Sequence, residues 1–326
     1  MAVAADQAEG REGKSGFSNW MSELPDQLHD IPLWNLAIPG SHDAMSYDLD
    51  IKSSIMEPDQ LICFSSLACV RQKVYNWSVT QEVNITEQLD AGIRYFDLRI
   101  ARKPNDSDPT RLYFAHGLYT RTDVETVLKE IKDWAKGHPK EILILALSHF
   151  HGIDKSVEKE IYGHLIKFIK DLFGAKLFPT KETPTLKLCW ESGRNVIVSL
   201  EYPRGQEHDP DIRGGITYYY GNSMYPEEIK SKLDHYLTDE KRYNIFFICG
   251  LNLTLPDDIK AVKYIISLSA TLVKATEKSL PSMLEWVKKQ TPGDGEKCVN
   301  IIASDLVNRD DFVSTVIKLN DKLLKT

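Results

Sequence analysis

The stretch EILILALSHF (141–150) combines an almost unbroken apolar run with a serine and a histidine near its end. A strand with one solvated face alternates apolar and polar residues, whereas this run leaves almost no polar face. It therefore predicts a strand of a parallel sheet that is covered on both faces. Polar residues at the carboxyl end of such a strand lie where parallel sheets place their functional sites.

Seven further runs of this kind occur along the chain: LWNLAI (33–38), RYFDLRI (94–100), LYFAH (112–116), NVIVSLEY (195–202), ITYYY (216–220), NIFFICGLNL (244–253) and VNIIASDL (299–306). Helical periodicities lie between several of them, over 124–137, 157–172 and 312–324. Eight strands that alternate with helices predict an α/β fold of the irregular TIM (β/α)8-type barrel, as a single domain. An open doubly wound sheet is the alternative, but no glycine-rich nucleotide fingerprint follows any strand.

Composition narrows the class of protein. The chain of 326 residues is 42% apolar and 27% charged, as is usual for globular proteins, and its net charge of −7 gives little support to a nucleic-acid partner. No apolar run approaches the ~18 residues that a transmembrane segment needs. Five cysteines without CxxC spacing predict reduced thiols, hence a cytoplasmic protein, with the nucleus left open. We expect residues 1–16 to form a disordered tail and 17–326 the barrel.

Ionisable residues recur where the predicted strands end. Six strands carry them: His42 and Asp43, Asp97 and Arg99, His116, Ser148 and His149, Glu201, and Asp305. In a closed barrel the last strand lies beside the first, which would bring Asp305 next to His42 as an orienting acid. Two histidines across a pocket can act as general base and general acid, and Arg99 can hold phosphate oxygens. The set predicts phosphoryl-transfer chemistry, although His42 alone would fit a structural turn after a bend made by Gly40.

Five segments then carry a family likeness: IPGSHDAM (38–45), ITEQLDAGIRYFDLRIA (85–101), LYFAHGLY (112–119), EILILALSHFHG (141–152) and VIVSLEY (196–202). In this order they resemble the X-region of phosphatidylinositol-specific phospholipases C. The likeness runs from about Trp20 to Leu324 and is to the small eukaryotic members that contain this catalytic region alone. The resemblance implies an irregular TIM barrel, in agreement with the strand pattern.

The resemblance also implies a reaction. His42 matches the general base that activates the inositol 2-hydroxyl, which attacks its own phosphodiester to form a cyclic inositol phosphate. His116 matches the general acid that protonates the departing diacylglycerol oxygen, and Asp305 matches an aspartate beside the base. Asp43 and Asp97 match positions around the phosphate. The implied activity is that of a phosphoinositide phospholipase C-like phosphodiesterase, and the implied partner is an inositol phospholipid at a membrane surface.

Three residues of the family pattern bear on the expected cofactor and on the headgroup. Arg99 stands where eukaryotic enzymes have an acidic calcium ligand and bacterial metal-independent members have an arginine, so we expect no metal cofactor. Ser148 stands where bacterial members carry a lysine, and Glu201 resembles a eukaryotic calcium ligand. We expect Asp97, Ser148 and Glu201 to bind substrate; the alternative is Ca²⁺ held by Asp43, Asp97 and Glu201. The headgroup stays open.

Two further alternatives concern activity and membrane contact. The departures at Ser148 and Glu201 allow a catalytically weak or inactive barrel that binds inositol lipid or a protein partner. The long connection 53–81 brings apolar residues close to two basic ones: Met56, Leu61, Ile62, Phe64 and Leu67 beside Arg71 and Lys73. These residues predict a small amphipathic helix packed on the barrel or, alternatively, an element that contacts lipid. The three tyrosines 218–220 are expected in the wall or core, and the sequence does not indicate an oligomeric state.

Overall fold

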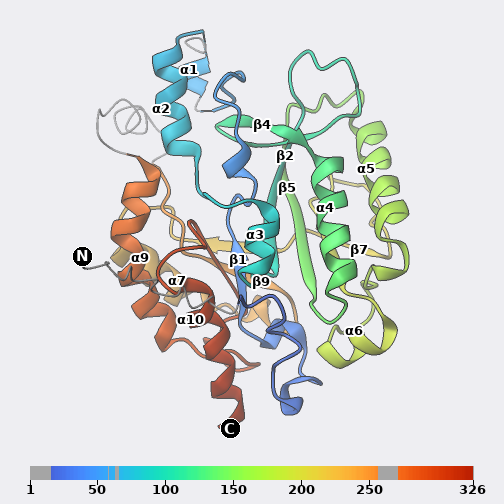
Figure 1. Ribbon diagram of the computed structural model, residues 1–326, viewed down its shortest axis with the longest axis vertical. Helices are drawn as coiled ribbons and strands as arrows, with labels where there is room; N and C mark the ends of the chain where they lie inside the picture. The colour runs from blue at the N-terminus through green and yellow to red at the C-terminus, as the bar shows by residue number, and fades with distance from the viewer. Residues whose placement is uncertain (1–15, 58, 63–65, 256–270, 326) are drawn as a thin grey trace, which may run out of the picture.

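The computed structural model describes residues 16–57, 59–62, 66–255 and 271–325 (Figure 1). Its centre is a curled sheet of eight strands, each parallel to its neighbours, in the order β7 (Ile212–Arg213), β6 (Val196–Leu200), β5 (Leu143–His151), β2 (Tyr95–Ala101), β1 (Ile38–Ser41), β10 (Ile301–Ser304), β9 (Phe247–Gly250) and β8 (Thr217–Tyr220). The sheet path ends at β7 and β8, and no pairing closes it within the described residues. The predicted single-domain α/β barrel is confirmed in this irregular, incompletely closed form.

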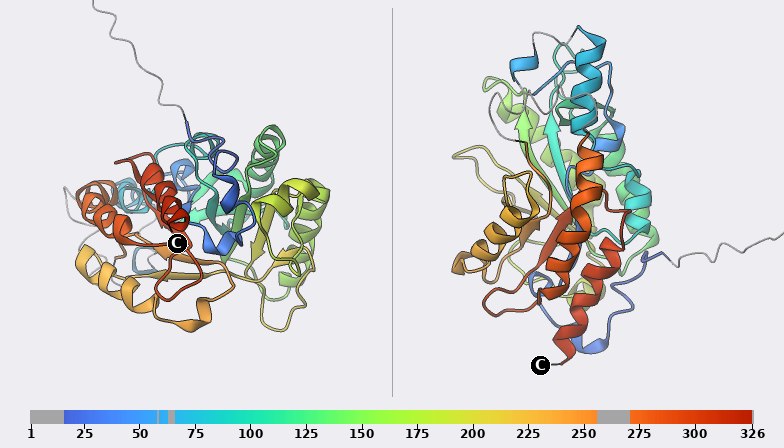
Figure 2. Two further views of the ribbon diagram at one scale, coloured as in Figure 1. Left: turned by 90° about the horizontal axis from the view of Figure 1, so that it is seen from below. Right: turned by 90° about the vertical axis from the view of Figure 1, so that its left-hand side faces the viewer.

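Helices cover the outside of the sheet (Figures 1 and 2). They are α4 (Val124–Gly137), α5 (Glu158–Phe173), α6 (Leu186–Ser192), α7 (Pro226–Tyr236), α9 (Leu272–Lys289) and α10 (Phe312–Lys318). The connection after β1 holds α1 (Asp59–Ile62), α2 (Ala68–Ser78) and α3 (Ile85–Asp90). Short 3₁₀ segments complete the chain at Asp26–Leu28, Leu33–Asn35, Ser46–Asp48, Gly174–Lys176, Glu240–Arg242 and Leu319–Leu324. In the described part of the chain, no helix combines the length and apolar character that a membrane crossing requires.

Two of the predicted strands differ from the structure. The first strand begins at Ile38 and not at Leu33, because Leu33–Asn35 form a 3₁₀ turn after Pro32. The run at 112–116 forms β3 (Tyr113–His116), which is antiparallel to β2 and makes a hairpin with β4 (Leu118–Asp123). The eighth parallel strand is instead β7, whose two residues are too few to produce an apolar run.

Gly40 has a different role from the expected one. It lies inside β1, where an added Cβ would come within 2.8 Å of the Tyr95 ring and 3.1 Å of the Ile301 side chain. The glycine is therefore required for close packing inside the barrel. The bend comes later, at Asp43, whose φ of 43° is left-handed.

Alternation along the strands sorts side chains between two hydrophobic layers. One cluster lies inside the barrel and includes Ile38, Tyr95, Ile144 and Ile301; it is closed at the amino ends of the strands by residues of the segment 20–36. The other cluster, which includes Phe96 and Leu98, packs under the helices. Because Tyr95 faces inward, Asp97 and Arg99 face inward too, beyond the point where the apolar core ends.

A buried ion pair joins the start of β2 to the segment before β5. Arg94 is fully buried, and its Nε and Nη2 donate to Glu141 Oε2 at 2.9 and 2.7 Å. Nη2 also donates to the carbonyl oxygens of Phe17 and Ser18, which ties the first described residues to the barrel. The tail expected at 1–16 lies, apart from Gly16, outside the described residues and stays a prediction.

Candidate active site

Neighbouring strands deliver their inward-facing residues to one end of the barrel. The register pairs Ser41 of β1 with Ser304 of β10, so the next residues, His42 and Asp305, face each other. In β2, Arg99 pairs with Ser148 of β5. The predicted rim of ionisable residues at the carboxyl ends of the strands therefore exists, with His116 supplied by the β3–β4 hairpin.

The His42 imidazole is buried between carboxylates. Its Nδ1 lies 2.7 Å from Asp305 Oδ1, and its Nε2 lies 3.2 Å from Asp43 Oδ2 and 2.8 Å from Arg99 Nη2. Burial alone lowers the pKa of His42, but the carboxylates of Asp43 and Asp305 outweigh burial, so its pKa is raised above the ordinary value. Since Asp305 accepts the Nδ1 proton, Nε2 is the atom that exchanges a proton with the site.

The Nε2 atom of His42 has a hydrogen-bonding partner whether the ring is neutral or protonated. In the neutral ring, Nε2 can accept a hydrogen bond from Arg99 Nη2; in the imidazolium, it can donate toward Asp43 Oδ2. Neither state leaves the ring without a partner, which is what a group that gains and loses a proton during a reaction requires.

Arg99 joins two buried acids. Its Nε lies 2.9 Å from Asp43 Oδ1 and 3.2 Å from Asp97 Oδ2, and 22% of its side chain is exposed. Burial lowers the pKa of Arg99, but Asp43 and Asp97 raise it by more, so the guanidinium stays charged. Asp97 also accepts the backbone N–H of Asp43 at 3.2 Å. The guanidinium is thus fixed at the base of the pocket and supplies a permanent positive charge.

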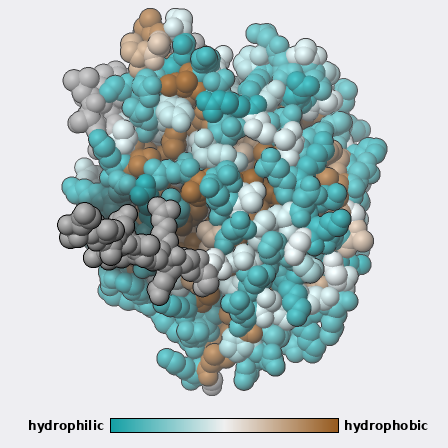
Figure 3. Space-filling model, in the orientation of Figure 1, coloured by the Kyte–Doolittle hydropathy of each residue, from teal (hydrophilic) through white to brown (hydrophobic). Residues whose placement is uncertain are grey.

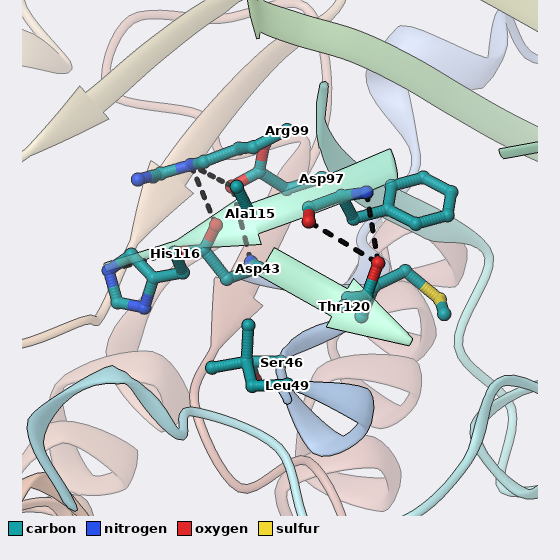
Figure 4. A pocket seen from close by; sticks show the side chains of 10 residues that line it. Asp43, Ser46, Leu49, Asp97, Arg99, Ala115, His116 and Thr120 are labelled. Carbon is teal, nitrogen blue, oxygen red and sulfur yellow. Dashed lines mark hydrogen bonds and ion pairs between the residues drawn. The ribbon is translucent and has the colours of Figure 1, made fainter. Parts of the chain in front are cut away.

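His116 lines a small pocket together with Asp43 and Arg99 (Figure 4), and its ring lies near that of His42. Their ring centroids are 6.1 Å apart and their planes meet at 78°. The Nδ1–H of His116 donates to the carbonyl oxygen of Ser78 at 2.7 Å, which leaves Nε2 facing Asp43 Oδ2 at 3.4 Å. One carboxylate, that of Asp43, therefore lies beside the proton-exchanging atom of each histidine.

Asp43 is held by charge more than by hydrogen bonding. It is buried, and within the residues that the structure describes neither carboxylate oxygen accepts a hydrogen bond of good geometry. Burial raises the pKa of Asp43, but Arg99 first and then the histidines lower it by more, so the group stays ionised. An ionised carboxylate with free lone pairs in a small pocket suits the stabilisation of two imidazolium ions in turn.

Ser148 and Glu201 occupy the next positions around the rim. Ser148 Oγ lies 3.4 Å from Asp97 Oδ1, to which it donates, and 2.9 Å from His149 Nδ1. Glu201 is exposed, and its Oε2 accepts the backbone N–H of His149 at 2.6 Å, where His149 has a left-handed φ of 52°. Ser148 is thus hydrogen-bonded to Asp97 of the central group of acids, whereas the Glu201 carboxylate bonds to the backbone near the end of β5.

The residues proposed as alternative calcium ligands are not all brought together. His42, Asp43 and Asp97 form the one group in the described ranges with ligand atoms within 4.8 Å of one another, and Glu201 is not part of it. The Arg99 guanidinium already lies against both carboxylates. A hard cation that prefers six to eight oxygen ligands fits this set poorly, because it would have to displace a fixed positive charge.

Several residues at the site escaped the sequence patterns. Ser78, Thr80 and Gln81, at the end of α2, contact the histidine-bearing segments, and no periodicity or motif marks them. Tyr218, by contrast, lies in the wall as expected: its ring centroid is 5.9 Å from that of His42, and its hydroxyl donates to Asn252 Oδ1 at 3.0 Å. Burial raises the pKa of Tyr218, so it forms an uncharged wall of the site.

Known proteins are similar to this chain in sequence and in fold. The protein-family model described as PI-PLC X 1 matches residues 74–317, a range that includes Asp97, Arg99, His116 and Asp305 but not His42. PI-PLC X domain-containing protein 1 of Homo sapiens is 41% identical over 319 residues, 95% of this chain and 94% of the relative. PI-PLC X domain-containing protein 3 of Homo sapiens is 38% identical over 315 residues, 93% of this chain and 94% of the relative.

Two solved bacterial structures share the fold. A phosphatidylinositol-specific phospholipase C from S. aureus superposes with a TM-score of 0.63 over 93% of this chain and 97% of its own, at 18% identity. The enzyme of the same name from Listeria monocytogenes gives a TM-score of 0.61 over 94% and 99%, at 22% identity. At these identities the likeness establishes the barrel architecture.

Proposed function

Since the chain belongs to the PI-PLC X family, we propose that it is a phosphodiesterase that cleaves the glycerophosphodiester bond of an inositol phospholipid. The observation that carries this proposal is the pair of histidines, His42 and His116, whose Nε2 atoms lie 3.2 and 3.4 Å from Asp43 Oδ2, with the Arg99 guanidinium beside His42. A base, an acid and a fixed cation are the three groups that an internal attack on a phosphodiester requires.

In the first step His42 Nε2 takes the proton of the inositol 2-hydroxyl, and that oxygen attacks the phosphorus. The bond from phosphorus to the diacylglycerol oxygen breaks, and His116 Nε2–H protonates this oxygen, which leaves as diacylglycerol. The product on the inositol side is a cyclic phosphodiester. Water can open it by the same two groups with their roles exchanged.

The surroundings of each histidine support its role. Asp305 and Asp43 stabilise the imidazolium that forms on His42, and their effect is visible in its raised pKa. The bond from His116 Nδ1 to Ser78 O turns Nε2 toward the pocket, where it lies 3.4 Å from Asp43 Oδ2. Arg99 offsets the negative charge on the phosphate oxygens, so we propose that the reaction needs no calcium.

We further propose that the connection after β1 contacts the lipid surface. Ile62 at the end of α1 and Leu67 just before α2 are 43% and 48% exposed. Figure 3 shows apolar side chains gathered at the end of the molecule where α1 lies. The connection also lies beside the site, because the Met56 N–H donates to the carbonyl oxygen of Gly117, next to His116. Phe64, expected in the same element, lies outside the described residues.

The direct test is incubation with phosphatidylinositol vesicles, followed by ³¹P NMR for cyclic inositol phosphate. Parallel samples contain excess EDTA or added calcium, and His42→Ala and His116→Ala proteins with wild-type thermal unfolding serve as controls. Turnover in EDTA that both substitutions abolish supports the proposal. Vesicle binding without any phosphorus product would favour the alternative, a barrel that binds inositol lipid without cleaving it.

A further inference from the structure

Two polar side chains from the connection after β1 are completely buried beside the site. Thr80 and Gln81 have 0% exposure and lie just after α2, which ends at Ser78. Burial of a hydroxyl and an amide costs free energy unless each finds hydrogen-bond partners. The Thr80 and Gln81 side chains bond mainly to backbone groups at or next to His42 and Asp305. The positions of these two side chains and of the reactive residues therefore depend on one another.

The hydroxyl bonds around Thr80 have a single consistent direction. Ser46 Oγ accepts the backbone N–H groups of Thr80 and Gln81 at 3.0 and 2.9 Å, which occupies both of its lone pairs. The Ser46 proton must then go to Thr80 Oγ1, which is 2.7 Å away. The Thr80 proton is left for the carbonyl oxygen of His42 at 3.1 Å or of Asp43 at 3.3 Å.

The Gln81 amide connects the ends of two strands. Its Nε2 donates to the carbonyl oxygens of His42 at 2.9 Å and Ser304 at 3.0 Å, and its Oε1 accepts the N–H of Val307 at 3.2 Å. The carbonyl oxygen of Thr80 accepts the N–H of Leu306 at 2.7 Å. The backbone is therefore held on both sides of Asp305 by the same two residues that hold His42.

These bonds lie just past the point where the sheet stops. The β1–β10 ladder ends at Ser41 and Ser304, with a last bond from the His42 N–H to the Ser304 carbonyl oxygen at 3.1 Å. From the structure we propose that Thr80 and Gln81 are positioning residues that set the His42–Asp305 geometry. This inference rests on the proposed function for its catalytic consequence, and Ser78 of the same segment orients His116.

Thr80→Val tests the role, because valine keeps the shape and removes the hydroxyl, while Thr80→Ser keeps the hydroxyl and is the matched control. Two readouts are used: steady-state kinetics on phosphatidylinositol vesicles, and the ¹H NMR signal of the His42 Nδ1–H bonded to Asp305, assigned by its loss in His42→Ala. For Thr80→Val we expect kcat to fall by about 10–100-fold at unchanged KM, as for a misplaced reactive group. We also expect the His42 signal to shift, and both effects to disappear in Thr80→Ser.

A folded Thr80→Val protein with wild-type kcat and an unshifted His42 signal would show that Thr80 only stabilises the fold and would overturn the inference. If Thr80→Val unfolds, Gln81→Met replaces it with the same readouts. The NMR arm needs no turnover. A wild-type protein without activity would therefore contradict the proposed function. A shifted His42 signal in Thr80→Val would still support the positioning role.

Discussion

Nδ1 of His42 and Oδ1 of Asp305 lie 2.7 Å apart, although 263 residues separate them in the chain. The parallel register of β1 and β10 makes this contact, because each residue directly follows the last pair of the ladder. A buried carboxylate at this distance both selects the tautomer of the ring and stabilises its protonated form. The effect of Asp305 should therefore be visible in the pH dependence of activity.

We predict that Asp305→Asn lowers kcat by about 10²–10⁴-fold and moves the acid limb of the pH–rate profile to lower pH. The carboxylate helps to raise the pKa of His42, so its removal lowers that pKa, and the ring stays neutral, as a base must be, in more acidic solution. The profile of kcat/KM on phosphatidylinositol vesicles measures this shift. Asp310→Asn, on the exposed connection after β10, is the control, and an acid limb that does not move would contradict the prediction.

For His116→Ala we expect the loss of activity to depend on the leaving group. Turnover of phosphatidylinositol should fall by about 10²–10⁴-fold, because the diacylglycerol oxygen departs without a proton. An inositol phosphodiester with a nitrophenol leaving group needs no such proton and should retain far more of its rate. His42→Ala should lose both reactions, and exposed His164→Ala neither. Equal losses of His116→Ala on the two substrates would refute the assignment of His116 as the acid.

Arg99→Lys should reduce kcat by about 10²–10³-fold, as loss of one fixed donor does at other charged transition states. The planar guanidinium of Arg99 contacts Asp43 and Asp97 through Nε and His42 through Nη2. The single, flexible ammonium group of a lysine cannot make these contacts at the same time. Exposed Arg111→Lys is the control. The rate of the wild-type protein should be the same in EDTA and in added calcium, and a rate that EDTA abolishes would sink the metal-independent mechanism.

The substitutions Ile62→Ser and Leu67→Ser should weaken vesicle binding, because each removes exposed apolar surface beside the site. Co-sedimentation with phosphatidylinositol-containing vesicles measures the loss. Ile245→Ser is a matched control: its side chain is 44% exposed and lies before β9, at the opposite end of the barrel. If all three variants bind vesicles as the wild type does, the connection after β1 is not a lipid contact.

Glu141→Ala should lower the free energy of unfolding by about 3–5 kcal/mol, because it leaves the buried Arg94 guanidinium without its counter-charge. Glu182→Ala breaks an exposed pair with Arg194 and should cost about 1 kcal/mol or less. Urea titration of both variants measures the difference. A cost for Glu141→Ala no larger than that for Glu182→Ala would show that the buried pair does not stabilise the barrel.

Sequence patterns predicted the parallel strands that are long and apolar, since a strand buried on both faces must be so. They failed where a strand is short or antiparallel: β7 has two residues, and β3 of the hairpin has the apolar composition of a buried parallel strand but runs antiparallel to β2. They also missed the start of β1, because the apolar residues of Leu33–Asn35 pack inside the barrel from a 3₁₀ turn.

The candidate site was predictable in outline, because strand ends in a parallel barrel converge. His42, Asp97, Arg99, His116 and Asp305 could be named from their places after apolar runs. Thr80 and Gln81 could not, since their function depends on backbone atoms of distant residues that no side-chain pattern encodes. Glu201 was named with the others but lies against the backbone of His149, one step away from the central cluster.

The pairing of β1 with β10 has a consequence for biosynthesis. A ribosome completes residues 38–42 long before residues 301–307, so a nascent chain has His42 without Asp305 while the intervening residues are being made. The backbone bonds from Gln81 to Ser304 and Val307 also form only once residues 301–307 have been made. A chain without residues 301–307 therefore lacks the His42–Asp305 pair, which forms only when β10 has docked beside β1.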